Sequence, residues 1–308
     1  MIMPGGILIR IKKIVSVDNT KLESSTIDKF RELADEVIIY EDYPNSNAEI
    51  ISRAKDADVL LVSWNTTIDQ EVIKCCPELR YIGMCCSLYD EKSANVDIKA
   101  ANKQGITVLG VRDYGDEGTI EFILSQLIRL LHGFGEQQWK EETTELTKQK
   151  LGIIGLGATG KMLAERAKAF GMEVFYYSRT RKPFYEEQTG IKYLELNDLL
   201  RHVDILSTHL PKKTVVLDEE QFKQFGQNKI LINTSLGPTF QLPAFEKWIA
   251  NQGNYAIFDK SGLGDQPDQF SKYDNVLYSE KVSGWTSQAK RRLSVKVLEN
   301  INKFLEQC

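Results

Sequence analysis

The stretch KLGIIGLGATG, residues Lys150–Gly160, decides the fold. A short apolar run leads directly into Gly-x-Gly-x-x-Gly, a helical segment (161–170) follows, and a second apolar run (172–177) comes next. In such a unit the first glycine allows a tight turn, the second admits a pyrophosphate, and the third lets helix and strand pack closely. The free N–H groups at the helix start favour phosphate. The stretch therefore predicts a dinucleotide site, the alternative being a glycine-rich turn that binds no ligand.

The end of the second apolar run indicates which dinucleotide is bound. NAD sites usually carry an acidic residue about 20 positions after the glycines, where it binds the ribose. Here that place holds Ser178, and the residues after it are Arg179, Thr180, Arg181 and Lys182. A hydroxyl with guanidinium groups suits a 2′-phosphate, which a carboxylate would repel. We therefore expect NADP, with NAD less favoured and a solvated basic loop as the alternative.

Strand and helix patterns alternate on both sides of this stretch. Apolar strand-like runs occur at 11–17, 36–40, 57–63, 80–84 and 105–109 before it, and at 203–208, 229–233, 255–258 and 275–278 after it. Helical runs separate the earlier strands, at 26–34, 49–54, 70–76 and 96–104. This alternation predicts an α/β protein with two doubly wound parallel sheets, one in a Rossmann domain and one in a flavodoxin-like domain.

The longest helical pattern, 116–134, precedes the nucleotide stretch. Its apolar residues recur at spacings of three and four, namely Ile120, Ile123, Leu124, Leu127, Leu131 and Phe134. Because the nucleotide stretch begins in the middle of the chain, we expect this helix to open an inserted cofactor domain, residues 116–285. Residues 1–115 would form an outer substrate domain, which the final amphipathic helix completes as residues 286–308.

Composition excludes several classes of protein. The chain has 308 residues, 42% hydrophobic and 27% charged, which is ordinary for a globular protein of two domains. With 39 basic and 43 acidic residues, its net charge of −4 argues against binding to nucleic acid. No apolar stretch approaches the roughly 18 residues of a membrane span. The five cysteines lack C-x-x-C spacing, so we expect free thiols, no metal site and a cytoplasmic protein.

Further runs together resemble one family. They are PELRYIG (77–83), ANVDIKAA (94–101), GITV (105–108), His209-Leu210-Pro211 with Thr214, and INTS (232–235). With the nucleotide stretch, they resemble the D-isomer-specific 2-hydroxyacid dehydrogenase family over nearly the whole chain. The resemblance implies an oxidoreductase that acts on a small molecule. The motif and the resemblance together imply that the cofactor is bound by Gly155, Leu156, Gly157, Ala158, Thr159, Gly160, Ser178, Arg179, Thr180, Arg181, His209, Pro211, Thr214, Thr234, Ser235, Leu236, Asp259 and Gly284.

The family's catalytic residues have no counterparts at the matching places. Similar proteins use an arginine that clamps the substrate carboxylate, a histidine that acts as general acid, and a glutamate that holds the histidine. The matching positions here hold Leu236, Lys281 and Gly264, respectively. On this resemblance Lys281 and Asp259 become the candidate catalytic residues. Asp259 and Lys260 are the charged residues expected nearest to the Lys281 amine.

The substrate loop and the dimer arm also depart from the family pattern. Where similar proteins have a glycine-rich turn that binds carboxylate, Gly83 is followed by MCCSLYDEK (84–92). The adjacent Cys85 and Cys86 in this loop receive no role. The polar segment 136–148 is expected to be a linker, and it is shorter than the arm that wraps the partner subunit in similar proteins. The shorter segment therefore neither implies nor excludes a homodimer.

Two functions from different classes remain open at this point. The first is NADPH-linked reduction of a C=O or C=N group, with Lys281 as proton donor, in a substrate other than a simple 2-oxo acid. The second is a catalytically silent NADP(H)-binding sensor or regulatory protein, which explains the three changed catalytic identities most simply.

Overall fold

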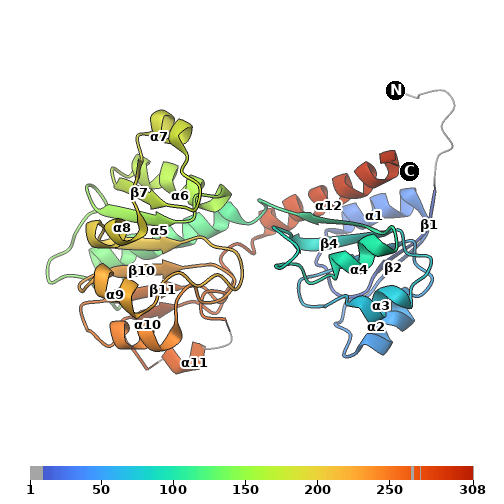
Figure 1. Ribbon diagram of the computed structural model, residues 1–308, viewed down its shortest axis with the longest axis horizontal. Helices are drawn as coiled ribbons and strands as arrows, with labels where there is room; N and C mark the ends of the chain where they lie inside the picture. Colours follow the sequence, from blue (N-terminus) through green and yellow to red (C-terminus); the bar gives the residue numbers. More distant parts are fainter. Residues whose placement is uncertain (1–9, 265–266, 271, 308) are drawn as a thin grey trace. The chain divides into compact units, whose positions relative to one another are not determined.

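The computed structural model describes residues 10–264, 267–270 and 272–307. The chain forms two compact units (Figure 1). The first unit contains the residues up to Tyr114 together with those from Ser287 onward, and the second contains Gly115–Thr286. The chain therefore passes from one unit to the other twice, and the second unit is an insertion in the first.

The first unit is a parallel sheet with strands in the order β2-β1-β3-β4-β5, the flavodoxin-like order. Its strands are β1 (Ile11–Ser16), β2 (Ala34–Ile39), β3 (Val59–Val62), β4 (Tyr81–Ser87) and β5 (Thr107–Val111). Its helices are α1 (Ser24–Leu33), α2 (Asn47–Ala54), α3 (Gln70–Lys74), α4 (Ile98–Lys103) and α12 (Ser287–Gln307). All four residues of β3 are buried, because helices cover both faces of such a sheet.

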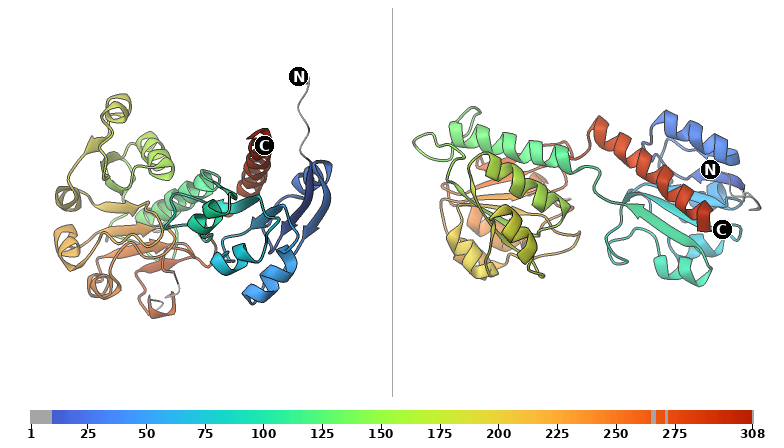
Figure 2. Two further views of the ribbon diagram at one scale, coloured as in Figure 1. Left: turned by 45° about the vertical axis from the view of Figure 1, so that its right-hand side comes forward. Right: turned by 90° about the horizontal axis from the view of Figure 1, so that it is seen from above.

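The last helix, α12, packs on the sheet of the first unit. Its buried residues recur at helical spacing, namely Leu293, Val297, Ile301 and Phe304. The Phe304 ring lies 4.9 Å from the ring of Tyr81 on β4, and the Asn300 side chain donates to the Gly110 carbonyl on β5. Figure 2 shows α12 running beside α1. The end of the chain thus covers a sheet built from its beginning.

The second unit is a parallel sheet in the order β12-β11-β10-β9-β6-β7-β8. Its strands are β6 (Lys150–Ile154), β7 (Glu173–Tyr177), β8 (Lys192–Tyr193), β9 (Ile205–Thr208), β10 (Ile230–Asn233), β11 (Tyr255–Phe258) and β12 (Val276–Tyr278). Its helices are α5 (Asp116–His132), α6 (Ala158–Ala169), α7 (Pro183–Thr189), α8 (Leu196–His202), α9 (Glu219–Phe225), α10 (Leu242–Ile249) and α11 (Pro267–Phe270). This is the Rossmann order with one added strand, so the expected pair of doubly wound sheets is confirmed.

Two core clusters cover the two faces of this second sheet. Ile230 and Ile232 of β10 belong to the cluster that contains α5 and α6, whereas Leu231 between them packs with α8, α9 and α10. The strand alternates because successive side chains point to opposite faces. The strand order reverses between β6 and β9, and in such sheets ligands bind outside the carboxyl ends of the strands at that point.

The expectation of a linker at 136–148 is wrong. Trp139 and Leu146 are only 6% and 5% exposed and belong to the core of the second unit. The backbone N–H of Trp139 donates to the Leu130 carbonyl near the end of α5, and the Tyr255 hydroxyl donates to the Gln138 carbonyl. The segment therefore folds back over its own unit, although most of its residues are polar.

Helix and strand ends differ from the sequence-based expectations by a few residues. The helix expected at 96–104 runs only from Ile98 to Lys103, because the Asp97 carboxylate caps it by accepting the Ala100 N–H. The helix expected at 116–134 ends at His132, where Gly133 takes the left-handed conformation.

Because Trp139 closes the core beside α5, Trp139→Ala should lower the unfolding free energy of the second unit by about 3–5 kcal/mol. Urea denaturation followed by far-UV circular dichroism measures this loss. Glu141→Ala is the matched control, since Glu141 is exposed in the same segment, and it should change stability by less than about 0.5 kcal/mol. Equal stability of the two variants would mean that the segment is a linker after all.

Candidate functional site

The nucleotide loop connects β6 to α6 and depends on two glycines. Gly155 has a φ of +97°, and a Cβ there would lie 2.2 Å from the His209 carbonyl oxygen. A Cβ on Gly160 would lie 2.2 Å from the Gly155 carbonyl oxygen. A Cβ on Gly157, by contrast, would meet no atom within 4 Å. The first and third glycines thus allow close packing, and the second leaves the open approach that a pyrophosphate needs.

The first turn of α6 is held in place from α5. The Thr159 hydroxyl donates a hydrogen bond to the carboxylate of Asp116, the first residue of α5. Leu156 is buried in the core below the loop, and the cap residue Gly157 makes no side-chain capping bond. The backbone N–H groups that begin at Ala158 have no acceptor within the helix, which fits a dinucleotide phosphate.

The end of β9 forms the neighbouring wall of the loop. The His209 N–H donates to the Ile154 carbonyl, and the imidazole Nε2 lies 2.9 Å from the Ser207 hydroxyl. Burial lowers the pKa of His209 to about 4, so the imidazole is neutral at physiological pH. Pro211 and Thr214 follow in a turn in which the Thr214 N–H donates to the Pro211 carbonyl.

The two arginines after β7 have different environments. The Arg181 guanidinium binds the Glu186 carboxylate with two hydrogen bonds, of 2.9 and 2.8 Å, and lies over the Tyr193 ring. This pairing lowers the pKa of the Glu186 carboxyl group. Arg179 is exposed, and the described part of the chain offers it no ion pair. The Ser178 hydroxyl donates to the Thr180 carbonyl, which closes the turn between the two arginines.

Polar side chains tie together the ends of β9 and β10. The Asn233 amide donates to the carbonyls of Gly237 and Gly262, and its oxygen accepts the Ser235 N–H. The Ser235 hydroxyl donates to the Thr208 carbonyl and accepts the Leu210 N–H. These bonds fix the backbone from Thr234 onward, and the next side chain, Leu236, is 46% exposed.

Asp259 ties the end of β11 to the loop after β12. Its carboxylate is 1% exposed and accepts hydrogen bonds from the N–H groups of Ser261 and Gly262 and from both the N–H and the hydroxyl of Ser283. Burial raises the pKa of Asp259, and these hydrogen bonds act in the opposite direction. The carboxylate therefore holds the loop that carries Lys281.

Lys281 and its neighbours lie on this loop. The Lys260 N–H donates to the Lys281 carbonyl, whereas the Lys281 side chain is exposed. Gly264, which we expected at the place of the family's glutamate, has a φ of +60°. Gly284 packs against the backbone just before α5, because a Cβ on it would lie 2.8 Å from the Gly115 oxygen. Asp259 and Lys281 are thus linked through backbone and not through a bond between their side chains.

Sequence reasoning missed the residues that support the site. Glu186, Asp116 and Ser283 each fix a residue or loop named above, and none belongs to a motif quoted above. Asn233 stands in the INTS run, which gave it no role of its own. Only Glu186 gave a local signal, because it follows Arg181 by five residues at the start of a helix. In the described parts of the chain, no cluster of His, Cys, Asp and Glu side chains suits a metal ion, and no helix is long and apolar enough to span a membrane.

Comparisons with known proteins found related sequences and structures over most of the chain. Residues 123–278 match the NAD-binding domain of D-isomer-specific 2-hydroxyacid dehydrogenases. A glyoxylate reductase of Korarchaeum cryptofilum is 30% identical, covering 85% of this chain and 83% of its own. A hydroxypyruvate reductase of Blautia hydrogenotrophica is 26% identical, covering 96% and 97%. Among solved structures, an acyclic imino acid reductase in complex with NADPH and D-Arg superposes with a TM-score of 0.82 at 23% identity, covering 96% and 97%.

The lowered pKa of His209 predicts a loss of stability in mild acid. The unfolded chain protonates this histidine near pH 6.5, whereas the folded protein does so only near pH 4. The stabilisation is therefore complete above about pH 6.5 and is lost as the pH falls toward 4. Between pH 7.5 and pH 5, the wild type should lose about 1–2 kcal/mol more unfolding free energy than His209→Gln.

Urea denaturation at the two pH values measures this difference. His202→Gln, an exposed substitution on α8, is the control. Between the two pH values it should lose as much unfolding free energy as the wild type does. The same pH dependence in wild type and His209→Gln would show that the imidazole is not kept neutral by the fold.

Proposed function

Because the chain belongs to the D-isomer-specific 2-hydroxyacid dehydrogenase family, we propose that it is an NADPH-linked reductase of a C=O or C=N group in a substrate other than a simple 2-oxo acid. One observation carries this proposal. The loops after β10 and β12 present Leu236 and Lys281 as exposed side chains, at the places where the family pattern has its arginine and its histidine.

Ser178 and Arg179 support NADPH as the cofactor. No carboxylate stands at the end of β7, and Arg179 offers an exposed guanidinium without an ion pair in the described chain. Arg181 is already bound to Glu186 and lies over Tyr193. In this proposal Arg179 contacts the 2′-phosphate directly, while Arg181 stiffens the turn and adds positive charge behind it.

Leu236, the residue after the Asn233–Ser235 network, limits which substrates can be bound. A 2-oxo acid needs a guanidinium that binds its carboxylate with two parallel hydrogen bonds and orients the oxo group. Leu236 supplies no donor. In the first unit, the Arg112 guanidinium is held by the carbonyls of Leu88 and Tyr89, at 2.6 and 2.7 Å. The proposal therefore assigns a substrate whose reacting carbon carries no adjacent carboxylate.

Lys281 is the proposed proton donor and Asp259 a positioning residue. When bound, NADPH supplies the hydride. The Lys281 ammonium donates a proton to the carbonyl oxygen or imine nitrogen, which neutralises the charge that develops there. Asp259 acts through Ser283, because its buried carboxylate binds both the N–H and the hydroxyl of that residue and so holds the Lys281 loop. The solved imino acid reductase shows that this fold accommodates reduction of a C=N group in another protein.

A catalytically silent NADP(H) sensor is the second candidate, and a specific observation favours it. The Lys281 side chain is exposed, and the described chain provides it with no hydrogen bond from its amine to Asp259. The Asp259 carboxylate is already satisfied by Ser261, Gly262 and Ser283. A loop held this firmly also suits a protein that closes on the cofactor and signals to a partner.

Segment 136–148 and the cysteines bear on the partners and the cellular compartment of the protein. A small molecule is the expected partner, and a homodimer built on an exchanged arm is not, since segment 136–148 packs in its own core through Trp139 and Leu146. Cys75, Cys76, Cys85 and Cys86 are free thiols, which suits a reducing cytoplasm.

Arg179→Ala should weaken NADPH binding by about 10- to 100-fold, because a charge-assisted hydrogen bond contributes about 1.5–3 kcal/mol. NADH affinity should not change, because NADH lacks the 2′-phosphate. Calorimetric titration of both cofactors measures this. Arg201→Ala is the matched control, since it removes an exposed arginine from α8 of the same unit. Equal NADPH and NADH affinity in the wild type would contradict the cofactor assignment.

In a screen of aldehydes, ketones and imines with NADPH, Lys281→Ala should reduce kcat by about 10²- to 10⁴-fold while leaving NADPH affinity unchanged. Lys281→Arg should also fail, because a guanidinium does not release its proton. Lys223→Ala is the control, as it removes an exposed lysine from α9 of the same unit. If the wild type reduces none of these compounds but binds NADPH, the sensor replaces the reductase.

Glyoxylate, hydroxypyruvate and pyruvate should be turned over negligibly by the wild type, because Leu236 supplies no carboxylate clamp. Steady-state oxidation of NADPH at 340 nm measures this. Robust activity on any of the three would show that another arginine, Arg112 being the first to test, takes the missing role.

A further inference from the structure

The start of α5, residues 115–119, packs against the loop that carries Lys281. A Cβ on Gly118 would lie 2.7 Å from the Ser283 carbonyl oxygen, and a Cβ on Gly284 would lie 2.8 Å from the Gly115 oxygen. Glycine weakens a helix relative to alanine, yet Gly118 stands in the first turn of α5. The close approach of the loop backbone explains why this position carries no side chain.

A hydroxyl group at the start of α5 extends this contact to Asp259. The Thr119 hydroxyl donates to the Gly115 carbonyl, at 3.2 Å, and lies 3.4 Å from the Ser283 hydroxyl. The Ser283 hydroxyl donates to the buried Asp259 carboxylate at 2.7 Å. The loop after β12 is therefore held from two sides, by the carboxylate that follows β11 and by the start of α5.

The start of α5 also holds the nucleotide loop. The Asp116 carboxylate accepts a hydrogen bond from the Thr159 hydroxyl, and the helix dipole favours a carboxylate at this end of a helix. Thr159 stands in the first turn of α6, whose free N–H groups suit the phosphates of a dinucleotide. One short segment thus contacts both the loop that carries the proposed proton donor and the loop that would bind the cofactor's phosphates.

We propose that the start of α5 is a positioning element of the reductase, in which Gly118 and Thr119 fix the Lys281 loop and Asp116 fixes the nucleotide loop. This inference rests on the proposed function. A proton donor must come within hydrogen-bond reach of the reacting atom, and a misplacement of about 1 Å can lower a rate about 100-fold. Because one helix start holds both loops, the Lys281 loop keeps a fixed distance from the nucleotide loop.

Hydrogen exchange of the full-length protein, followed by mass spectrometry without NADPH, reads the loop after β12 independently of turnover. The Ser283 N–H is protected by its hydrogen bond to Asp259. Because the added methyl group of Gly118→Ala would displace the Ser283 backbone, peptide 279–286 should exchange at least about tenfold faster in this variant. Thr119→Val should act in the same direction, and Thr119→Ser, which restores the hydroxyl, should exchange like the wild type. Thermal melts check that the variants are folded.

Turnover separates a positioning role from a merely structural one. On the best substrate of the reductase screen, Gly118→Ala should lower kcat at least about tenfold, while NADPH affinity changes less than about threefold. A residue that only stabilises the fold would lower the melting temperature and leave kcat of the folded protein unchanged. Ser125→Ala, at an exposed position two turns further along α5, is the control and should match the wild type in exchange and in kcat.

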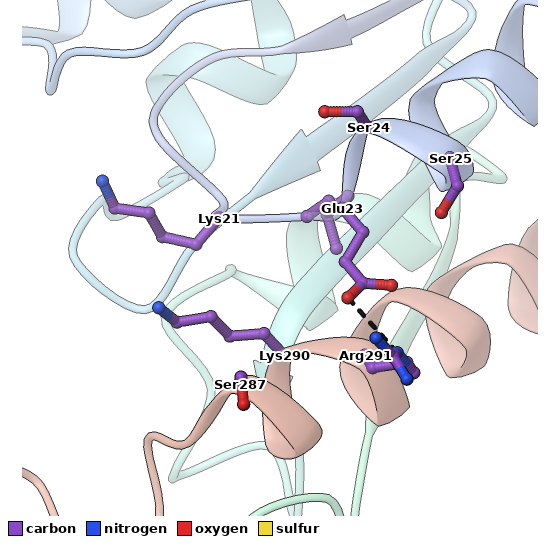
Figure 3. Close-up of a pocket in the computed structure, with 8 residues that line it drawn as sticks. Lys21, Glu23, Ser24, Ser25, Ser287, Lys290 and Arg291 are labelled. Carbon is purple, nitrogen blue, oxygen red and sulfur yellow. Dashed lines mark hydrogen bonds and ion pairs between the residues drawn. The ribbon is translucent and has the colours of Figure 1, made fainter.

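The contact with the nucleotide loop has its own test. Asp116→Ala should speed the exchange of peptide 155–162 at least about fivefold, whereas Asp116→Asn keeps an acceptor for Thr159 and should exchange like the wild type. Glu23→Ala is the matched control. Glu23 also stands at a helix start, that of α1, and its carboxylate lies 3.5 Å from the Arg291 guanidinium on α12 (Figure 3). This variant of the first unit should leave the exchange of peptide 155–162 unchanged.

Unchanged exchange of peptide 279–286 in both Gly118→Ala and Thr119→Val would overturn the inference, as would an equal change in Ser125→Ala. A wild-type kcat in Gly118→Ala, despite faster exchange, would also overturn it, because the contact would then be structural only. A wild type that binds NADPH but reduces no compound defeats the proposed function and, with it, the role in turnover, even where the exchange rates change as expected.

Discussion

The close approach of Gly155 and Gly160 is the contact on which the second unit depends. The space between them leaves no room for a side chain, since a Cβ on Gly160 would lie 2.2 Å from the Gly155 oxygen. This contact lets α6 begin directly above β6 and points its free N–H groups across the carboxyl end of the sheet. The His209 N–H, just after β9, donates to the Ile154 carbonyl at the end of β6, directly before the same turn. The start of α6 therefore lies at the point where the strand order reverses.

A buried polar network extends this edge of the sheet toward β12. Asn233, Ser235 and Asp259 use their side chains to hold the loops after β9, β10, β11 and β12, and both carboxylate oxygens of Asp259 accept hydrogen bonds. Buried polar groups are costly unless they are satisfied, and a satisfied network specifies one backbone arrangement. The exposed side chains on these loops, Leu236 and Lys281, can therefore be exchanged without disturbing the backbone. This separation of a fixed frame from variable tips is the physical basis of the proposed change in substrate.

The sequence predicted the features that depend on local patterns. The glycine spacing at 155–160 and the apolar runs of both sheets were sufficient for two doubly wound domains. Segment 136–148 was misjudged because Trp139 and Leu146 stand among polar residues with no helical or strand period. The bonds from Thr159 to Asp116 and from Ser283 to Asp259 depend on contacts between elements that are far apart in the sequence. Periodicity and spacing carry no information about such contacts.

In the proposed function, Arg179 in the turn after β7 and Lys281 in the loop after β12 lie at opposite ends of a bound NADPH. A crystal structure of the protein with NADPH tests it most directly. We expect the Arg179 guanidinium to contact the 2′-phosphate, and the Lys281 amine to lie within about 3 Å of a water or ligand atom positioned over the nicotinamide ring. A Lys281 amine that stays in solvent, with no group above the nicotinamide in hydrogen-bond reach, would contradict the claim.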